Sequence, residues 1–208
     1  MTSLLTPQAK VWACAFVYCI GGAVPADAAS VQIQVIDTTG KALEDAAVFL
    51  EPRDAKQVSK PLQGAEITQI DKQFVPSVLV VTTGTSVAFP NRDTVRHHVY
   101  SFSSTKTFEL KLYTGTSASP VVFDRPGIAV LGCNIHDAMT AWVVVVDTPY
   151  FARTRANGEA SMSEVVPGNY RLRVWHPSMP VGAPASEQSL SVGNSDVSLK
   201  FRLGGQRS

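Results

Sequence analysis

Short strand-like segments separated by turn residues are the feature that most constrains the fold of this chain. Between residues 31 and 203, runs of β-branched and aromatic residues recur at close spacing, as in VQIQVID (31–37) and AWVVVVD (141–147). Gly, Pro, Asn and Asp separate the runs, as is typical of turns between strands. No segment combines a 3.6-residue apolar period with helix caps. The pattern therefore predicts an all-β fold built of sandwiches or barrels.

The charges of the chain are nearly balanced. Lys and Arg number 18 against 17 Asp and Glu, for a formal net charge of +1, and no dense run of basic residues occurs. Proteins that bind nucleic acid neutralise phosphates with clustered Lys and Arg, so the composition gives no case for a nucleic-acid partner.

The first 28 residues are typical of a secretory signal peptide. Lys10 precedes the apolar run VWACAFVYCIGGAV (11–24), and Ala26 and Ala28 form a small-x-small cleavage site. The run is shorter than the roughly 20 residues that a membrane helix needs. We therefore expect residues 1–28 to direct export to the periplasm and to be removed. An uncleaved anchor is the alternative, and it would be the one contact of the chain with a membrane.

Export would leave a single cysteine in the chain. Cys14 and Cys19 lie within the predicted signal peptide, so Cys133 alone remains. Exported proteins normally pair their cysteines, and an unpaired one indicates a reactive thiol, an intermolecular disulfide or a metal ligand. An inert buried cysteine is the alternative interpretation.

Cys133, His136 and Met139 follow one another at three-residue intervals in VLGCNIHDAMTAW (130–142). A thiolate with imidazoles and a weak axial thioether suits copper and defines the blue-copper electron-transfer site. Packing of Met139 in a core is the alternative for that residue.

Such a site needs a second imidazole from elsewhere in the chain. The candidates are His97 and His98, at the entry of a predicted strand, and His176 in VWHPSM. A strand start and a distant loop between strands can meet at one end of a sandwich. Because side chains alternate along a strand, His97 and His98 should point to opposite faces. His176 is expected to pack or cap within its own loop.

Residues 65–147 resemble a small cupredoxin of the plastocyanin and amicyanin type. The segment ITQIDKQFVPSVLVVTTGTSVAFPNRD (67–93) resembles the opening strands of that family, and NRDTVRHHV resembles the segment that carries its first histidine. FDRPGIAVLGCNIHDAM (123–139) resembles the ligand loop, with the short Cys-x-x-His-x-x-Met spacing of amicyanin-like proteins.

The resemblance implies one type 1 copper held by His97, Cys133, His136 and Met139. Cys133 would supply the thiolate, the two histidines would complete the trigonal plane, and Met139 would be the axial ligand. His97 is preferred to His98 because of strand alternation and its spacing from Asn91. His98 would then lie behind the ligands or at the surface.

Two residues depart from the family pattern. His98 stands where the family usually has Asn, which helps to join the two ligand segments. Asp137 follows the loop histidine, where family members tend to have an apolar residue or Pro. An acidic side chain at that edge would favour docking of a basic partner.

The flanking segments resemble a second fold. VQIQVIDTTGKALEDAAVFLEP (31–52) and TRANGEASMSEVVPGNYRLRVWHP (154–177) resemble parts of a transthyretin-like or carboxypeptidase-regulatory-like β-sandwich. The two resemblances imply a Greek-key cupredoxin sandwich (65–147) inserted in, or packed against, a small Ig-like sandwich formed by 29–52 and 148–208. Polar residues 53–64 are the expected linker.

Three functions follow as hypotheses. The first is a periplasmic blue-copper protein that carries single electrons between redox partners, such as a c-type cytochrome and a periplasmic dehydrogenase. The second is a copper chaperone or sensor, because Cys, Met and His also suit Cu(I). The third is an envelope binding or scaffold module with a degenerate cupredoxin. An enzyme is not expected, because no second copper cluster or acid–base pair is visible.

Overall fold

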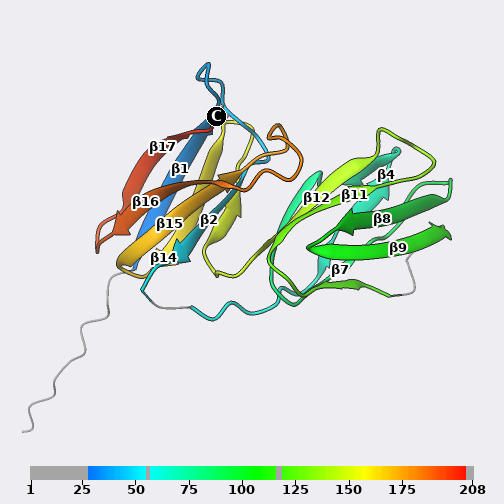
Figure 1. Cartoon of the computed structure of the whole chain (residues 1–208), viewed down its shortest axis with the longest axis horizontal. Helices are drawn as coiled ribbons and strands as arrows, with labels where there is room; N and C mark the ends of the chain where they lie inside the picture. The colour runs from blue at the N-terminus through cyan, green and yellow to red at the C-terminus, as the bar shows by residue number, and fades with distance from the viewer. Residues whose placement is uncertain (1–27, 55–56, 116–118, 205–208) are drawn as a thin grey trace, which may run out of the picture.

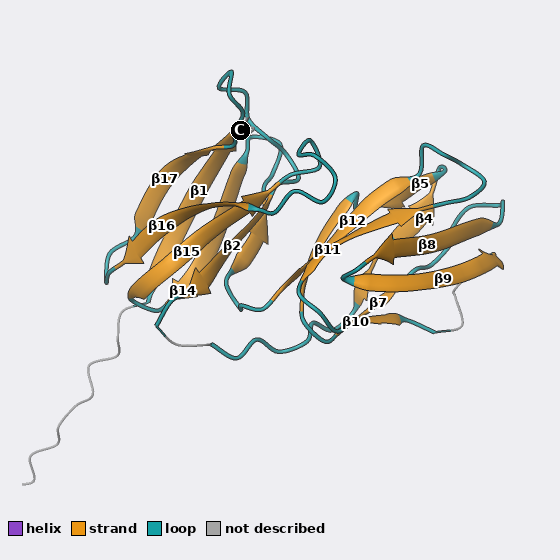
Figure 2. Cartoon of the chain, viewed as in Figure 1, coloured by secondary structure: helices purple, strands orange, loops and turns teal. Residues whose placement is uncertain are grey.

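The computed structural model describes residues 28–54, 57–115 and 119–204, and every regular element in these ranges is a β-strand (Figure 2). The predicted all-β class is therefore confirmed. The predicted signal peptide lies outside the described residues, except for Ala28. Within the described ranges, no helix has the length and apolar character that a membrane crossing requires.

Strands from the two ends of the chain form one pair of sheets (Figure 1). The first has the order β14-β1-β17, with β14 (Glu159–Val165), β1 (Ala29–Ile36) and β17 (Val197–Arg202). The second has the order β13-β2-β15-β16, with β13 (Phe151–Arg153), β2 (Ala47–Pro52), β15 (Gly168–Trp175) and β16 (Ser186–Val192). Alternate residues of β1, namely Val31, Ile33 and Val35, are buried in the core that these strands share. We call these strands the flanking sandwich.

Strands from the middle of the chain form the other sheets, which we call the central sandwich. A five-stranded sheet has the order β6-β12-β11-β8-β9, with β6 (Val78–Thr82), β12 (Thr140–Val146), β11 (Gly127–Gly132), β8 (His97–Ser103) and β9 (Lys106–Tyr113). A three-stranded sheet has the order β10-β7-β3, with β10 (Val121–Phe123), β7 (Thr85–Ala88) and β3 (Ala65–Glu66). A hairpin joins β4 (Thr68–Ile70) to β5 (Gln73–Val75).

The two sandwiches pack against each other because β12 is apolar on both faces. Val143 and Val145 point into the core of the central sandwich. Val144 and Val146 belong to a separate buried cluster with Phe49 and Trp175 of the flanking sandwich, so the two sandwiches bury apolar side chains against each other. The strands of the flanking sandwich fall within 29–52 and 148–208, and those of the central one within 65–147. We retain the predicted domain limits as a proposal.

The order of β11 and β8 determines where the candidate ligands lie. The two strands are antiparallel neighbours, with Gly132 opposite Tyr100. The end of β11 therefore lies beside the start of β8, which brings the loop after Gly132 close to His97. A strand start and a loop far along the chain meet at one end of the sandwich.

Candidate metal centre

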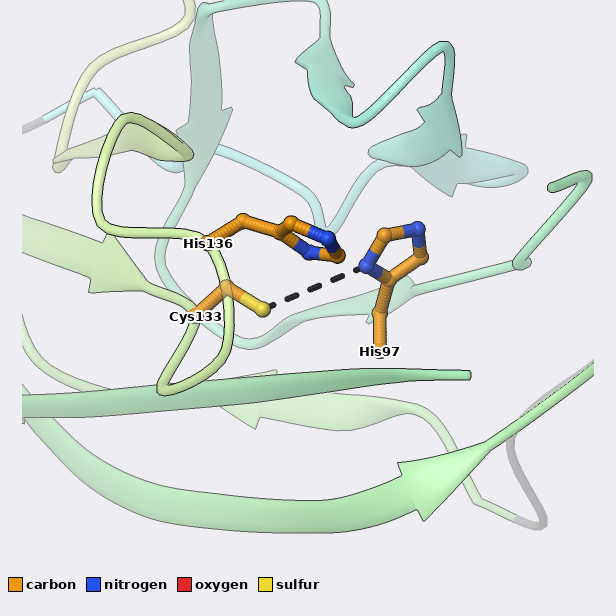
Figure 3. Close-up of side chains that lie close together, drawn as sticks. All are labelled: His97, Cys133 and His136. Atoms are coloured by element: carbon orange, nitrogen blue, oxygen red, sulfur yellow. Dashed lines mark hydrogen bonds between the residues drawn. The ribbon is translucent and has the colours of Figure 1, made fainter. Parts of the chain in front are cut away.

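Three side chains with metal-binding atoms converge at this end of the central sandwich. The donor atoms of His97, Cys133 and His136 all lie within 4.8 Å of one another. Cys133 Sγ is 4.0 Å from Nδ1 of His97, and the two imidazole rings have centroids 5.0 Å apart. Figure 3 shows the three side chains pointing toward a common space, His97 from β8 and the other two from the loop between β11 and β12.

Burial of the group differs from residue to residue. His97 is fully buried and Cys133 is 4% exposed, whereas His136 is half-buried. Cys133 packs among the apolar residues of the central core. The loop then turns back, and the backbone N–H of Met139 donates to the carbonyl of His136 at 2.9 Å. Two donors of the group are therefore shielded from water, and the third lies at the rim.

Asp93 fixes the orientation of His97. The Asp93 carboxylate lies 2.6 Å from Nε2 of His97 and also accepts hydrogen bonds from the backbone N–H groups of Asp71 and Lys72, at 2.7 and 3.0 Å. Burial alone would raise the pKa of Asp93, but these hydrogen bonds outweigh it and hold the pKa below its usual value. An ionised carboxylate only accepts, so the proton of His97 stays on Nε2 and the lone pair of Nδ1 faces Cys133.

The imidazole of His136 has an unpaired buried atom. Its Nδ1 is inaccessible to water and has no hydrogen-bond partner among the residues that the structure describes. A buried polar atom without a partner is costly, and such atoms in native proteins call for an explanation such as an ion. A metal ion among the three donors would satisfy Nδ1 of His136, and thiolate with two imidazoles suits copper. The residues present therefore fit the predicted metal.

Met139 is fully buried in the same core cluster as Cys133. Its backbone hydrogen bond to His136 closes the loop, so the predicted ligands Cys133, His136 and Met139 share one compact turn. The axial role of Met139 stays a prediction.

His98 points away from the three donors, as strand alternation predicts. Its Nε2 pairs with Oε1 of Glu109 on β9 at 2.9 Å. The residue is only 5% exposed, so it does not lie at the surface. The structure thus brings His97, and not His98, together with Cys133 and His136.

The remaining residues singled out in the sequence, His176 and Asp137, are not among the three converging donors. Nδ1 of His176 lies 2.7 Å from Ser178 Oγ in its own loop, as predicted, but Nε2 lies 2.9 Å from the carbonyl of Glu44, which comes before β2 and is distant in the sequence. Burial lowers the pKa of His176. Asp137 is exposed beside His136, at the rim of the candidate site.

The sequence analysis used Asn91 only for its spacing from His97 and did not predict the hydrogen bonds by which Asn91 and Asp93 hold the segment before β8 in place. Asn91 donates from Nδ2 to the carbonyls of Val95 and Tyr113, at 2.9 and 2.8 Å, and accepts at Oδ1 from the backbone N–H of Asp93. Asn and Asp in a loop commonly bond to nearby backbone, which was the available signal. The contact from Asp93 to the His97 ring could not be predicted, because it depends on the conformation of a loop, and loops have no sequence periodicity.

The chain was compared with known proteins. No protein-family model and no curated protein matches it. Among solved structures, it is similar to a copper-containing nitrite reductase (NirK) from Thermus scotoductus SA-01, at 21% identity over 46% of this chain and 25% of that one, with a TM-score of 0.38. The chain thus spans a quarter of the length of that reductase.

Two smaller proteins are also similar to the chain. A point mutant of amicyanin, in its reduced Cu(I) form at pH 4, is 19% identical over 48% of this chain and 98% of that one, with a TM-score of 0.37. A purple cupredoxin from Nitrosopumilus maritimus is 23% identical over 39% and 99%, with a TM-score of 0.33. Because these identities and TM-scores are low, the functional reasoning that follows rests on the residues of the site.

Proposed function

We propose that the protein binds one type 1 copper ion through His97, Cys133, His136 and Met139 and carries single electrons between redox partners. The convergence of one sulfur and two imidazole nitrogens at a strand end is the observation that supports this most strongly. The unpartnered Nδ1 of His136 adds to it. When bound, the copper supplies one-electron oxidation and reduction.

The protein's own residues prepare the site for that chemistry. Asp93 keeps the proton of His97 on Nε2, so Nδ1 is free to bind. Cys133 must lose its proton when it binds a metal, and its burial in the core keeps water from the sulfur. His97 is the first residue of β8 and Cys133 directly follows β11, so the sheet limits the movement of both side chains.

Electrons would enter and leave at the rim of the site. His136 is half-buried and lies between the exposed residues Ile135 and Asp137. The carboxylate of Asp137 favours a partner with a basic docking face. A c-type cytochrome or a periplasmic dehydrogenase is the proposed partner. Because all four proposed ligands come from the protein, no position stays open for a substrate, and we assign no catalysis to the site.

The proposal includes the predicted organisation of the chain. Residues 1–28 direct export to the periplasm, the central sandwich (65–147) is the cupredoxin, and the flanking segments 29–52 and 148–208 form the transthyretin-like or carboxypeptidase-regulatory-like sandwich.

An electron-transfer cycle tests the proposed function. The chain from residue 29 onward, loaded with one equivalent of Cu(II), should be intensely blue and should lose its colour on oxidising a reduced c-type cytochrome. Asp137→Lys should keep the colour and slow the reaction with a basic cytochrome, because the rim charge is reversed. If the protein stays colourless with Cu(II) and binds only Cu(I), the chaperone or sensor hypothesis would be favoured. If the protein takes up no copper and Cys133 reacts freely with an alkylating reagent, the scaffold hypothesis would be favoured.

A further inference from the structure

Strand β9 forms an open edge of the central sandwich. It is the last strand in the order β6-β12-β11-β8-β9, and among the described residues it pairs with β8 alone (Figure 2). An edge strand carries a row of unpaired N–H and C=O groups, which are a template for a further strand. The exposed residues of β9 are Thr107, Glu109, Lys111 and Leu112.

The register of β9 identifies the backbone groups that face outward. The two-residue turn 104–105 joins β8 to β9, and Ser103 lies opposite Lys106. Residues of an antiparallel pair alternate between exchanging hydrogen bonds with the partner strand and pointing away from it. Because a two-residue turn is closed by a hydrogen-bonded pair, the even-numbered residues from Lys106 to Leu110 bond to β8. The groups that face away from β8 are therefore those of Thr107, Glu109 and Lys111.

Two charged side chains of this edge are complementary to each other. Glu109 and Lys111 line the same surface hollow with His98, so they lie on one face of the sheet. Oε1 of Glu109 pairs with His98, but the side chain is 53% exposed and its other oxygen has no partner within the described residues. Lys111 has no ion-pair partner among those residues either. Each charge could therefore bind an opposite charge from outside.

A second copy of the chain supplies those charges in one register. If two β9 strands pair antiparallel about a two-fold axis through Leu110, Glu109 of each copy lies opposite Lys111 of the other. Opposite charges in directly facing positions stabilise a strand pair. A shift of the register by two residues would instead place Glu109 opposite Glu109, or Lys111 opposite Lys111, and like charges there destabilise the pair. The charges therefore select one register.

We propose that two copies of the protein associate through β9 in this register and join their five-stranded sheets into one. Lysine on an edge strand usually prevents pairing. Here the second copy brings a carboxylate to each Lys111, whereas a partner of another sequence would need the same pair of charges at the same spacing. The contact is isologous, as in most dimers. The proposal concerns association alone and rests on neither copper nor electron transfer.

Sedimentation equilibrium of the copper-free chain from residue 29 onward tests the association. We expect a reversible equilibrium between monomer and dimer at micromolar to millimolar protein concentration. Amide hydrogen exchange at Glu109 and Lys111 should slow as the dimer forms, because their N–H groups become hydrogen-bonded to the other copy. A chain that stays monomeric at every concentration, or a dimer that leaves both amides unprotected, would overturn the proposal.

Charge variants test the register. Lys111→Glu leaves two acids on the edge and Glu109→Lys leaves two bases, so each variant alone should weaken the dimer at least about tenfold. A mixture of the two restores opposite charges at both positions and should form a heterodimer. Lys200→Glu makes the same change of charge on β17, an edge strand of the flanking sandwich, and should leave the association unchanged.

Circular dichroism checks the folding of Glu109→Lys, which loses the pair with His98. Lys111→Glu removes no ion pair of the described structure, so its effect decides the question even if Glu109→Lys does not fold. A dimer that resists Lys111→Glu, one that Lys200→Glu weakens as much, or two folded variants that do not associate on mixing would contradict the proposed register.

Discussion

Replacing Asp93 by asparagine tests how the candidate ligand His97 is oriented. Asp93 Oδ1 accepts from the backbone N–H of Asp71, and Oδ2 accepts from the N–H of Lys72 and from Nε2 of His97. Asn has the same shape but only one oxygen, so its NH₂ group must occupy one of these two positions. Neither position suits a donor, because both face N–H groups.

The magnitude follows from the bonds that are lost. With NH₂ at the Oδ1 position, the bond to Asp71 disappears. With NH₂ at Oδ2, the bond to Lys72 disappears and His97 must accept at Nε2, which moves its proton to Nδ1, the atom that faces Cys133. Hydrogen bonds to charged groups contribute about 1.5–3 kcal/mol each, so we expect Asp93→Asn to lower the free energy of unfolding by about 2 kcal/mol. Copper affinity should fall about 10–100-fold, as for other partners of metal-binding histidines.

Urea denaturation of copper-free protein and copper competition with a chelator measure the two effects. Because the pKa of Asp93 is held below the ordinary value of 3.8, its contribution to stability is present above that pH and is lost on acidification. The difference in stability between the two proteins should therefore shrink below pH 3.8. Asp124→Asn, at an exposed pair with Lys106, is the matched control and should change stability by less than about 1 kcal/mol. Unchanged copper affinity in Asp93→Asn would refute the reasoning.

Three further predictions concern neighbouring contacts. His98→Gln should leave copper affinity, measured by chelator competition, within about threefold of the original, because His98 pairs with Glu109 on the opposite face of the strand. A large loss of affinity would indicate that His98, and not His97, binds the copper. Gly132→Ala should lower the free energy of unfolding by about 1–3 kcal/mol, because the new Cβ would lie 2.7 Å from Cζ of Tyr100, and Tyr100→Ala should relieve part of that loss. Burial raises the pKa of both Tyr113 and Tyr170 to about 12, so stability should fall as pH rises from 10 toward 12, and Tyr113→Phe should reduce that fall in urea titrations without abolishing it.

The sequence was sufficient to predict the fold class and to predict that the two segments carrying the candidate ligands lie close together. Strand alternation predicted that His97 and His98 point to opposite faces, because the period of a strand is a local property. Cys133 and its loop indicated the end of the sandwich at which the structure brings His97, Cys133 and His136 together. The burial of His98 could not be predicted, because it depends on Glu109 from the neighbouring strand.

The contact between the two sandwiches could be predicted only in part from the sequence. The continuous apolar run at 141–146 is typical of a strand that is buried on both faces. Nothing in the run specifies that Phe49 and Trp175, from distant strands, cover one end of the sheet face turned away from the central core and leave Phe102 exposed at the other. Such contacts depend on how two cores fit together, which no local period encodes.

The visible spectrum of the copper-loaded chain tests the central claim most directly. Cu(II) is added in steps to the protein from residue 29 onward and to its Cys133→Ser variant, whose folding is checked by circular dichroism. The account predicts an intense thiolate-to-copper absorption band that saturates at one equivalent in the unsubstituted protein and is absent from the folded variant. A colourless unsubstituted protein, or a band that persists in Cys133→Ser, would contradict it.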